Sequence, residues 1–166
     1  GMIWGIIGMG AIGRRVAEIA RLFGCKVIYY STTGKNRQTE YRQVSLEELL
    51  EHSDIVSVHA PLTSDTENLM DENAFSRMKK SAIFLNLGRG PIVSEQALAD
   101  ALNQGQIRAA GLDVLCKEPM SSDNPLRFIK DSDRLLITPH IAWASVEART
   151  RLMTIILEQI REFFKL

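Results

Sequence analysis

Arg89 and His140 follow stretches of strand character, and Glu118 lies on the irregular loop between them. The residues occur in NLGRGP, CKEP and TPHIAWAS. Histidine exchanges protons near neutral pH, and a carboxylate beside it stabilises the imidazolium and fixes the tautomer. Arginine binds a carboxylate in two-pronged fashion and polarises a neighbouring carbonyl group. The set therefore suits a reaction in which hydride joins or leaves a carbon whose oxygen gains or loses a proton.

Each of these residues also has an ordinary structural explanation. Arg89 suits a surface ion pair, Glu118 a solvated loop acid and His140 a capped turn. The other histidines, His52 and His59, are interpreted as structural, because they lie near a helix end and a strand end. If Arg89, Glu118 and His140 lie together in space, the functional interpretation is favoured.

The elements that must position these residues alternate along the whole chain. Strands are predicted at 3–7, 26–30, 55–58, 82–87, 109–114 and 135–138, and helices at 12–23, 45–50, 72–78, 94–103 and 145–165. This order predicts an α/β domain spanning residues 1–166, with a doubly wound parallel sheet of the Rossmann type in three α/β/α layers. Ligands bind such sheets beyond the carboxyl ends of the strands, where Arg89, Asp113 and His140 are expected.

Several reactive or bulky side chains are expected only to pack. Cys25 and Cys116 lie far apart without a CxxC motif, so both are interpreted as reduced packing cysteines. Met153, Phe163 and Phe164 of the last helix are also interpreted as packing residues.

The composition limits the classes of protein. A chain of 166 residues can bury a core without disulfides or a metal. Twenty basic and twenty acidic residues balance, which gives no general attraction to nucleic acid or to an anionic membrane. No apolar run approaches the roughly 18 residues of a spanning helix, and no signal peptide opens the chain. We expect a cytoplasmic protein that binds neither nucleic acid nor membrane.

A glycine-rich turn, GMGAIG, lies between the first predicted strand and the first helix. The GxGxxG pattern is weak alone, but here it follows a strand and opens a helix. Gly8 would make the tight turn, Gly10 would let a pyrophosphate approach the backbone, and Gly13 would let the helix pack on the strand. The amides of Ala11 and Ile12 would face the anion. The turn predicts a dinucleotide site.

The stretch YYSTTGKN, at the end of the second predicted strand, indicates which dinucleotide is bound. An acid that takes the ribose hydroxyl of NAD is expected there, but the chain has Ser31. Thr32 and Thr33 can donate hydroxyl hydrogen bonds, and Lys35 and Arg37 add positive charge. This set favours NADP over NAD. A polar, solvated turn is the other interpretation, because loop lysines are usually solvated. Ser and Thr can also bind the ribose hydroxyl of NAD.

The sequence resembles the cofactor-binding domain of the D-isomer-specific 2-hydroxyacid dehydrogenases. The motifs occur in family order: GIIGMGAIG, HAPLT at 59–63, NLGRG at 86–90, GLDV at 111–114, KEP at 117–119 and TPHIAWAS at 138–145. The resemblance implies that Arg89 orients the substrate, His140 is the acid/base and Glu118 assists it. It also implies that Asp113 contacts the nicotinamide carboxamide. Three further positions would line the cofactor cleft: Pro61, Thr66 and the backbone of Leu87.

The chain departs from this family in two ways. The family commonly has Asp where this chain has Ser31, in agreement with the interpretation of the loop. The family's separate substrate domain is absent, and Gly1 precedes Met2, so we expect an excised domain that binds cofactor and turns over poorly. By resemblance we expect a 2-oxo acid and D-2-hydroxy acid pair, for example hydroxypyruvate and glycerate, and a homodimer. A dinucleotide-sensing regulator or corepressor is the rival interpretation.

Overall fold

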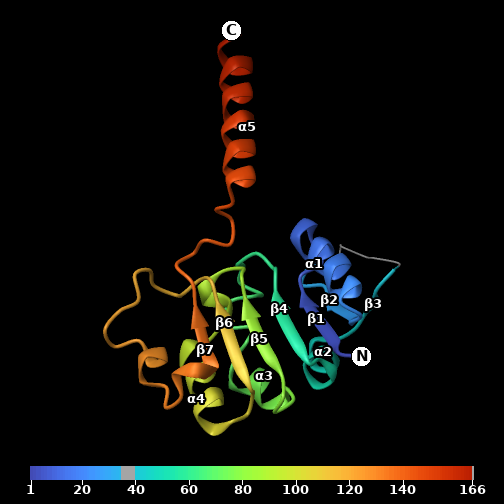
Figure 1. Cartoon of the computed structure of the whole chain (residues 1–166), viewed down its shortest axis with the longest axis vertical. Helices are drawn as coiled ribbons and strands as arrows, with labels where there is room; N and C mark the ends of the chain where they lie inside the picture. Colours follow the sequence, from blue (N-terminus) through green and yellow to red (C-terminus); the bar gives the residue numbers. More distant parts are fainter. Residues whose placement is uncertain (35–39, 166) are drawn as a thin grey trace.

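The computed structural model describes residues 1–34 and 40–165, within which seven strands form one parallel sheet in the order β3-β2-β1-β4-β5-β6-β7 (Figure 1). The strands are β1 (Ile3–Ile7), β2 (Lys26–Tyr30), β3 (Arg42–Gln43), β4 (Ile55–Val58), β5 (Ile83–Asn86), β6 (Ala109–Leu112) and β7 (Leu135–Ile137). The helices are α1 (Ala11–Leu22), α2 (Leu46–His52), α3 (Glu72–Arg77), α4 (Glu95–Gln104) and α5 (Val146–Phe164). Short 3-10 helices lie at Gly90–Ile92, Pro125–Phe128 and Ser132–Arg134.

The predicted α/β class and doubly wound parallel sheet are confirmed. Strand β3 was not predicted, because two residues are too few to form a pattern. The capping box expected at Ser45 is present, since the Ser45 hydroxyl accepts the N–H of Glu48 at 3.1 Å. Lys35 and Arg37, part of the predicted phosphate-binding loop, lie outside the described residues.

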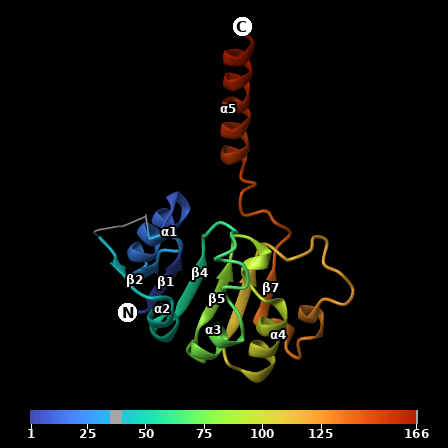
Figure 2. The same ribbon diagram turned by 180° about the vertical axis from the view of Figure 1, so that it is seen from behind.

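The two faces of the sheet are covered by different helices (Figure 1, Figure 2). Successive residues of a strand point to opposite faces. Ile6 of β1 packs with Ala17 of α1 and Tyr29 of β2. Its neighbour Ile7 belongs to a second cluster, which includes Leu49 and the other buried residues of α2, α3 and α4. Helix α1 therefore lies on one face, and α2, α3 and α4 lie on the other.

The predicted helix at the glycine turn is confirmed, but its buried side differs from its most apolar side. The buried residues of α1 are Gly13, Ala17 and Ala20. Ile12 and Phe23, which contributed to the helical pattern, are 66% and 81% exposed. Small side chains let the helix lie close to the sheet, so burial on α1 follows size more than hydrophobicity.

The face that carries α1 is open over the far strands. In the strand register, Ile6 is continued by Ser57 of β4, Leu85 of β5, Gly111 of β6 and Leu136 of β7. The last of these, Leu136, is 67% exposed. The helical layer on this face therefore covers less of the sheet than the three-layer prediction implied.

Helix α5 projects away from the sheet (Figure 1, Figure 2), and none of its described residues is buried. The prediction that Met153, Phe163 and Phe164 pack is wrong, because they are 63%, 80% and 64% exposed. The helix follows a turn whose Ile141 and Ala142 N–H groups donate to Asp113, the residue after β6. No helix in the described part of the chain has the length and apolar content to cross a membrane.

Candidate active site

The carboxyl ends of β5, β6 and β7 bring the predicted residues to one edge of the sheet. Asp113 directly follows β6, and its N–H donates to the carbonyl of Asn86 at the end of β5 (3.0 Å). Thr138 directly follows β7 and donates from its N–H to the last residue of β6 (2.9 Å). Arg89 and His140 lie just beyond the ends of β5 and β7. Parallel strands end at the same edge, so this clustering follows from the fold.

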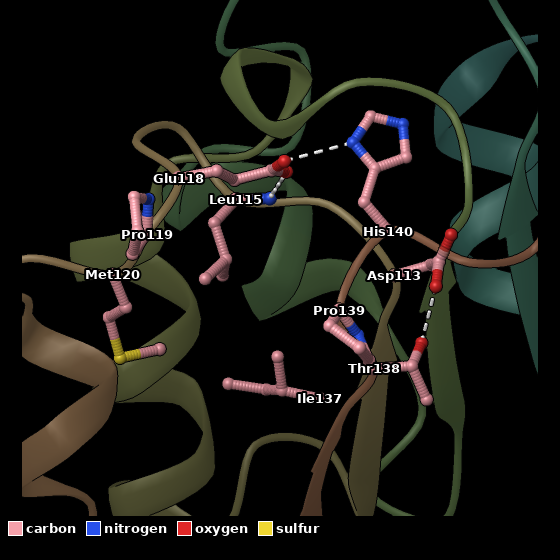
Figure 3. Close-up of a pocket in the computed structure, with 9 residues that line it drawn as sticks. All are labelled: Asp113, Leu115, Glu118, Pro119, Met120, Ile137, Thr138, Pro139 and His140. Atoms are coloured by element: carbon pink, nitrogen blue, oxygen red, sulfur yellow. Dashed lines mark hydrogen bonds and ion pairs between the residues drawn. The ribbon is translucent and has the colours of Figure 1, made fainter.

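Glu118 and His140 form a hydrogen-bonded pair (Figure 3). His140 Nδ1 lies 2.9 Å from Glu118 Oε2. The other oxygen of Glu118 accepts the N–H of Leu115 at 2.9 Å. The hydrogen bond from the Leu115 N–H and, to a smaller extent, the one from the His140 imidazole hold the pKa of Glu118 below its ordinary value. An ionised carboxylate only accepts hydrogen bonds, so His140 Nδ1 donates and Nε2 is left to exchange a proton with a ligand.

The backbone of His140 is held in an uncommon conformation. Its φ is +53°, in the left-handed region that favours glycine. The carboxylate of Asp113 accepts the N–H of Ile141 at 2.9 Å and that of Ala142 at 2.8 Å. The indole N–H of Trp143 donates to the His140 carbonyl at 2.8 Å. These bonds fix the turn that presents the imidazole.

Asp113 has a role in the structure that the resemblance did not indicate. Its carboxylate also accepts the hydroxyl of Thr138 at 2.5 Å. Burial acts to raise the pKa of Asp113, but the hydrogen bonds from Thr138 and the two turn amides outweigh it, and the net pKa is lowered. We interpret Asp113 as a residue that positions His140. Its contact with a nicotinamide carboxamide stays a prediction.

His140 stands between two cavities at this edge. A cavity of about 650 Å³ opens on the Glu118 side (Figure 3). Its apolar walls are formed by Leu115, Pro119, Met120, Ile137 and Pro139. A second cavity, of about 330 Å³, is lined by Arg89, Asp113 and His140 and reaches Ile12 at the start of α1. The arginine and the histidine singled out from the sequence therefore face one cavity.

The side chain of Arg89 is not engaged by an acid. No carboxylate in the described part of the chain forms an ion pair with Arg89. One guanidinium N–H donates to the carbonyl of Gly88 at 2.8 Å. The loop itself is held by the buried Asn86, which donates to the Arg89 carbonyl at 3.0 Å and accepts the Gly88 N–H at 3.1 Å. Arg89 is therefore available to bind an anionic ligand.

The glycine turn has the shape that a pyrophosphate needs. Gly8 has φ +95°, and a Cβ there would lie 2.7 Å from the backbone of the loop after β4. A Cβ on Gly13 would lie 2.2 Å from the Gly8 carbonyl oxygen, whereas on Gly10 it would meet nothing in the described structure within 4 Å. Helix α1 starts there with no acid in its first turn, and the amides of Ala11 and Ile12 belong to that turn. These residues fit a bound dinucleotide.

The end of β2 lies against this turn. The N–H of Gly8 donates to the carbonyl of Tyr30 at 3.0 Å. Ser31, which follows, is buried, and Thr32 comes next. The two hydroxyl residues thus follow β2 directly, next to the glycine turn. Contact with an adenosine ribose stays a prediction.

Comparison with known proteins decides the family. Residues 1–142 match the family model described as D-isomer specific 2-hydroxyacid dehydrogenase, NAD binding domain. The chain belongs to this family. It is 45% identical over 164 residues to the hydroxypyruvate reductase of Blautia hydrogenotrophica, covering 97% of this chain and 50% of that protein. The glyoxylate reductase of Aeropyrum pernix is 44% identical, over 98% of this chain and 49% of that protein. The chain spans about half the length of these relatives.

Solved structures of the 2-hydroxyacid dehydrogenases and of a related reductase share the fold. A D-lactate dehydrogenase from Aquifex aeolicus, complexed with NAD and lactic acid, superposes with a TM-score of 0.89 at 30% identity, covering 99% of this chain and 54% of that one. An acyclic imino acid reductase in complex with NADPH and D-Arg gives 0.88 at 39% identity, with 99% and 51% covered. The family and these structures support binding of NAD(P) by this dehydrogenase domain.

The three cleft positions implied by the family resemblance differ in exposure. Pro61 and Leu87 line a cavity of about 510 Å³ next to the glycine turn. Thr66 is only 1% exposed. Its hydroxyl donates to the Pro61 carbonyl at 2.7 Å and accepts the Thr63 N–H at 2.8 Å. In this dehydrogenase domain Thr66 therefore shapes the loop that carries Pro61.

Three residues of the site were not found from the sequence. Asn86 and Trp143 hold the Arg89 and His140 loops, and only the folded backbone shows what they contact. His59, interpreted as structural, lines the 330 Å³ cavity as well as the 510 Å³ one. It directly follows β4, and this position after a strand, which singled out Asp113, was interpreted at His59 as structural.

Proposed function

We propose that this chain is the cofactor-binding and catalytic-residue domain of an NAD(P)-dependent dehydrogenase that interconverts a 2-oxo acid and a D-2-hydroxy acid. The observation that supports it best is the shared cavity of Arg89 and His140, with Glu118 hydrogen-bonded to the far nitrogen of the imidazole. An anion-binding group and a proton-exchanging group on one cavity wall are what a 2-oxo acid requires.

A nicotinamide bound in the cleft would supply the hydride for reduction and accept it in oxidation. Arg89 binds the substrate carboxylate with two hydrogen bonds and polarises the adjacent carbonyl. In reduction, Nε2 of His140 gives its proton to the carbonyl oxygen, which becomes the hydroxyl. In oxidation, Nε2 removes that proton. Glu118 accepts from Nδ1 throughout and stabilises the imidazolium state.

The test compares turnover with cofactor binding in the His140→Asn variant. Because the chain spans half of its relatives, turnover is measured in a protein that joins it to the remaining half of the Blautia hydroxypyruvate reductase. We expect the rate to fall by about 10²–10⁴-fold, while the Kd for NADH changes little. His52→Asn, on the exposed end of α2, is the matched control and should keep full turnover. Unchanged turnover in His140→Asn would remove His140 from the chemistry.

The end of β2 supports a preference for NADPH over NADH. Ser31 stands where an acid would repel the 2′-phosphate, and Thr32 is a hydroxyl donor beside it. Lys35 is expected to add charge to this loop. Titration with both cofactors measures the ratio of the two Kd values. Ser31→Asp should shift that ratio toward NADH by about tenfold or more, and Lys35→Ala should shift it in the same direction. An unaltered ratio in both variants would refute this preference.

The substrate we propose is hydroxypyruvate, reduced to D-glycerate. Support comes from the names of the relatives, which include the Blautia hydroxypyruvate reductase and the glycerate dehydrogenase of Methylorubrum extorquens, 39% identical over 163 residues. Comparison of kcat/KM for hydroxypyruvate, glyoxylate and pyruvate tests the choice.

A homodimer is also proposed, from family resemblance and the exposed apolar residues of α5, and sedimentation velocity measures it.

A dinucleotide-sensing regulator is less well supported. The Glu118–His140 pair, and Arg89 without an ion-pair partner among the described residues, are groups that catalysis uses and that sensing alone does not need. The relatives are reductases and dehydrogenases by name.

A further inference from the structure

His59 is a largely buried histidine that the proposed mechanism does not use. It lines the 330 Å³ cavity with Arg89 and His140, and the 510 Å³ cavity with Ile12 and Gly88. Its backbone is tied to β1, since its N–H donates to the Ile7 carbonyl at 2.8 Å. The imidazole therefore lies between the glycine turn and the side chains of Arg89 and His140.

A hydrogen-bonded relay fixes which ring nitrogen of His59 carries the hydrogen. The indole N–H of Trp4 donates to the hydroxyl oxygen of Ser57 at 2.9 Å, and that oxygen lies 3.1 Å from Nε2 of His59. Ser57 is only 1% exposed, so its O–H needs a partner within the protein. Among the described residues, Nε2 is the acceptor within reach. The Ser57 hydroxyl thus donates to Nε2, and the ring hydrogen sits on Nδ1.

The ring is neutral under the conditions in which a dehydrogenase works. Burial lowers the pKa of His59 to about 4. Arg89 in the same cavity is charged and is needed for the substrate carboxylate. A neutral N–H donor beside it contributes a hydrogen bond without a second positive charge that would compete for that carboxylate.

We propose that Nδ1–H of His59 donates a hydrogen bond to the bound dinucleotide, at an oxygen between its pyrophosphate and its nicotinamide ribose. The location follows from the two cavities, because His59 lines both the cavity next to the glycine turn and the cavity that Arg89 and His140 share. The inference rests on the proposed dehydrogenase function, since it needs a dinucleotide in this cleft. It adds a cofactor-binding residue that contacts the ligand through a neutral side chain with a fixed tautomer.

The first test needs no substitution. Long-range ¹⁵N–¹H NMR of the 166-residue chain reports which nitrogen of His59 is protonated. We expect a neutral ring with hydrogen on Nδ1, and a shift of that resonance when NADH is added. Hydrogen on Nε2, or an Nδ1 resonance that does not respond to saturating NADH, would overturn the proposal.

The second test uses two variants that differ in where they place an amide. Asparagine puts its amide near the Nδ1 position, whereas glutamine reaches the Nε2 position. We expect His59→Asn to keep the Kd for NADH within about twofold, and His59→Gln to raise it about fivefold to tenfold. His52→Gln, on the exposed end of α2, is the matched control and should bind as the wild type does. Equal weakening in both His59 variants would mean that the residue is only structural.

Shorter ligands locate the acceptor. ADP-ribose retains the pyrophosphate and second ribose, whereas AMP occupies only the adenosine end. The His59→Gln penalty should appear with ADP-ribose and vanish with AMP, and an equal penalty with AMP would overturn the assignment. If His59→Gln does not fold, Ser57→Ala replaces it, because loss of the hydroxyl releases Nε2 and should raise the Kd about twofold. Failure of the wild-type chain to bind either NADH or NADPH would refute the proposed function itself, and with it this inference. Binding by the wild type with equal Kd values in the two His59 variants would refute the inference alone.

Discussion

Replacement of Asp113 by asparagine tests whether the turn that presents His140 is held by one buried carboxylate. Asp113 is 5% exposed and accepts three hydrogen bonds, of 2.5, 2.9 and 2.8 Å, from a hydroxyl and two backbone amides. Asparagine keeps one oxygen and turns the other acceptor into a donor. At least one backbone N–H would then face an N–H₂ group, with neither group paired.

The magnitude follows from these contacts. A hydrogen bond to a charged group contributes roughly 1.5–3 kcal/mol, and a buried unpaired donor costs about 1–3 kcal/mol. We therefore expect Asp113→Asn to lower the free energy of unfolding by about 2–4 kcal/mol at pH 7. The folded pKa of Asp113 is lowered from its ordinary 3.8, so its stabilisation is complete above that value. The stabilisation is lost as the pH falls through the folded pKa, and the difference between variant and wild type should shrink there.

Urea unfolding and amide hydrogen exchange measure this effect. The amides of Ile141 and Ala142 should lose protection in Asp113→Asn by more than amides of α4, far from the turn. Asp65→Asn is the matched control, since Asp65 is exposed and accepts a hydrogen bond from Ser64 that is as long as 3.5 Å. A stability within 0.5 kcal/mol of wild type, with unaltered protection of the two turn amides, would show that Asp113 does not hold the turn.

Three further predictions follow from the same geometry. Gly13→Ala should destabilise the fold by about 1–3 kcal/mol, because its Cβ meets a carbonyl oxygen. Gly10→Ala should leave the melting temperature unchanged and weaken NADH binding at least about tenfold. Equal effects of the two variants on melting temperature and on binding would refute these separate roles. The pKa of His59, lowered from 6.5 to about 4, means that the unfolded chain binds a proton that the folded chain does not. Stability should fall by about 1.4 kcal/mol per pH unit from pH 6.5 to 4, and His59→Gln should remove this slope in urea titrations. Trp143→Phe removes the indole bond to the His140 carbonyl, so kcat in the joined protein should fall about threefold to tenfold with the Kd for NADH unchanged.

The elements that the sequence predicts well are those whose signals are local. β1 is a short apolar run ending in glycine, and the helix after it begins at a turn in which Gly8 and Gly13 leave no room for a Cβ. The strand-end rule then placed Arg89, Asp113 and His140 on one edge, because parallel strands share the direction of their carboxyl ends. None of these inferences required knowledge of which strands are neighbours.

The features that sequence reasoning missed depend on which surfaces meet. The apolar spacing on α1 indicated a helix, but its small residues face the sheet and Ile12 is left exposed. Apolar residues on α5 suggested packing, yet the helix projects away from the sheet. The role of Asp113 depends on the turn after β7, which is 28 residues away along the chain for Ile141. Such contacts are set by tertiary geometry and leave no periodic pattern.

The hydrogen-bonded pair of Glu118 and His140 is held in place by other groups of the domain. His140 is fixed on one side by Glu118 and beneath by the Asp113 turn, and both acids are themselves held by backbone amides. Arg89 differs, because its guanidinium rests on the carbonyl of Gly88 next to it. A substrate carboxylate would exchange that single bond for two charge-assisted ones, which is favourable without movement of the imidazole. Substrate binding should therefore reorient Arg89 while the protonation geometry at His140 stays as the domain builds it.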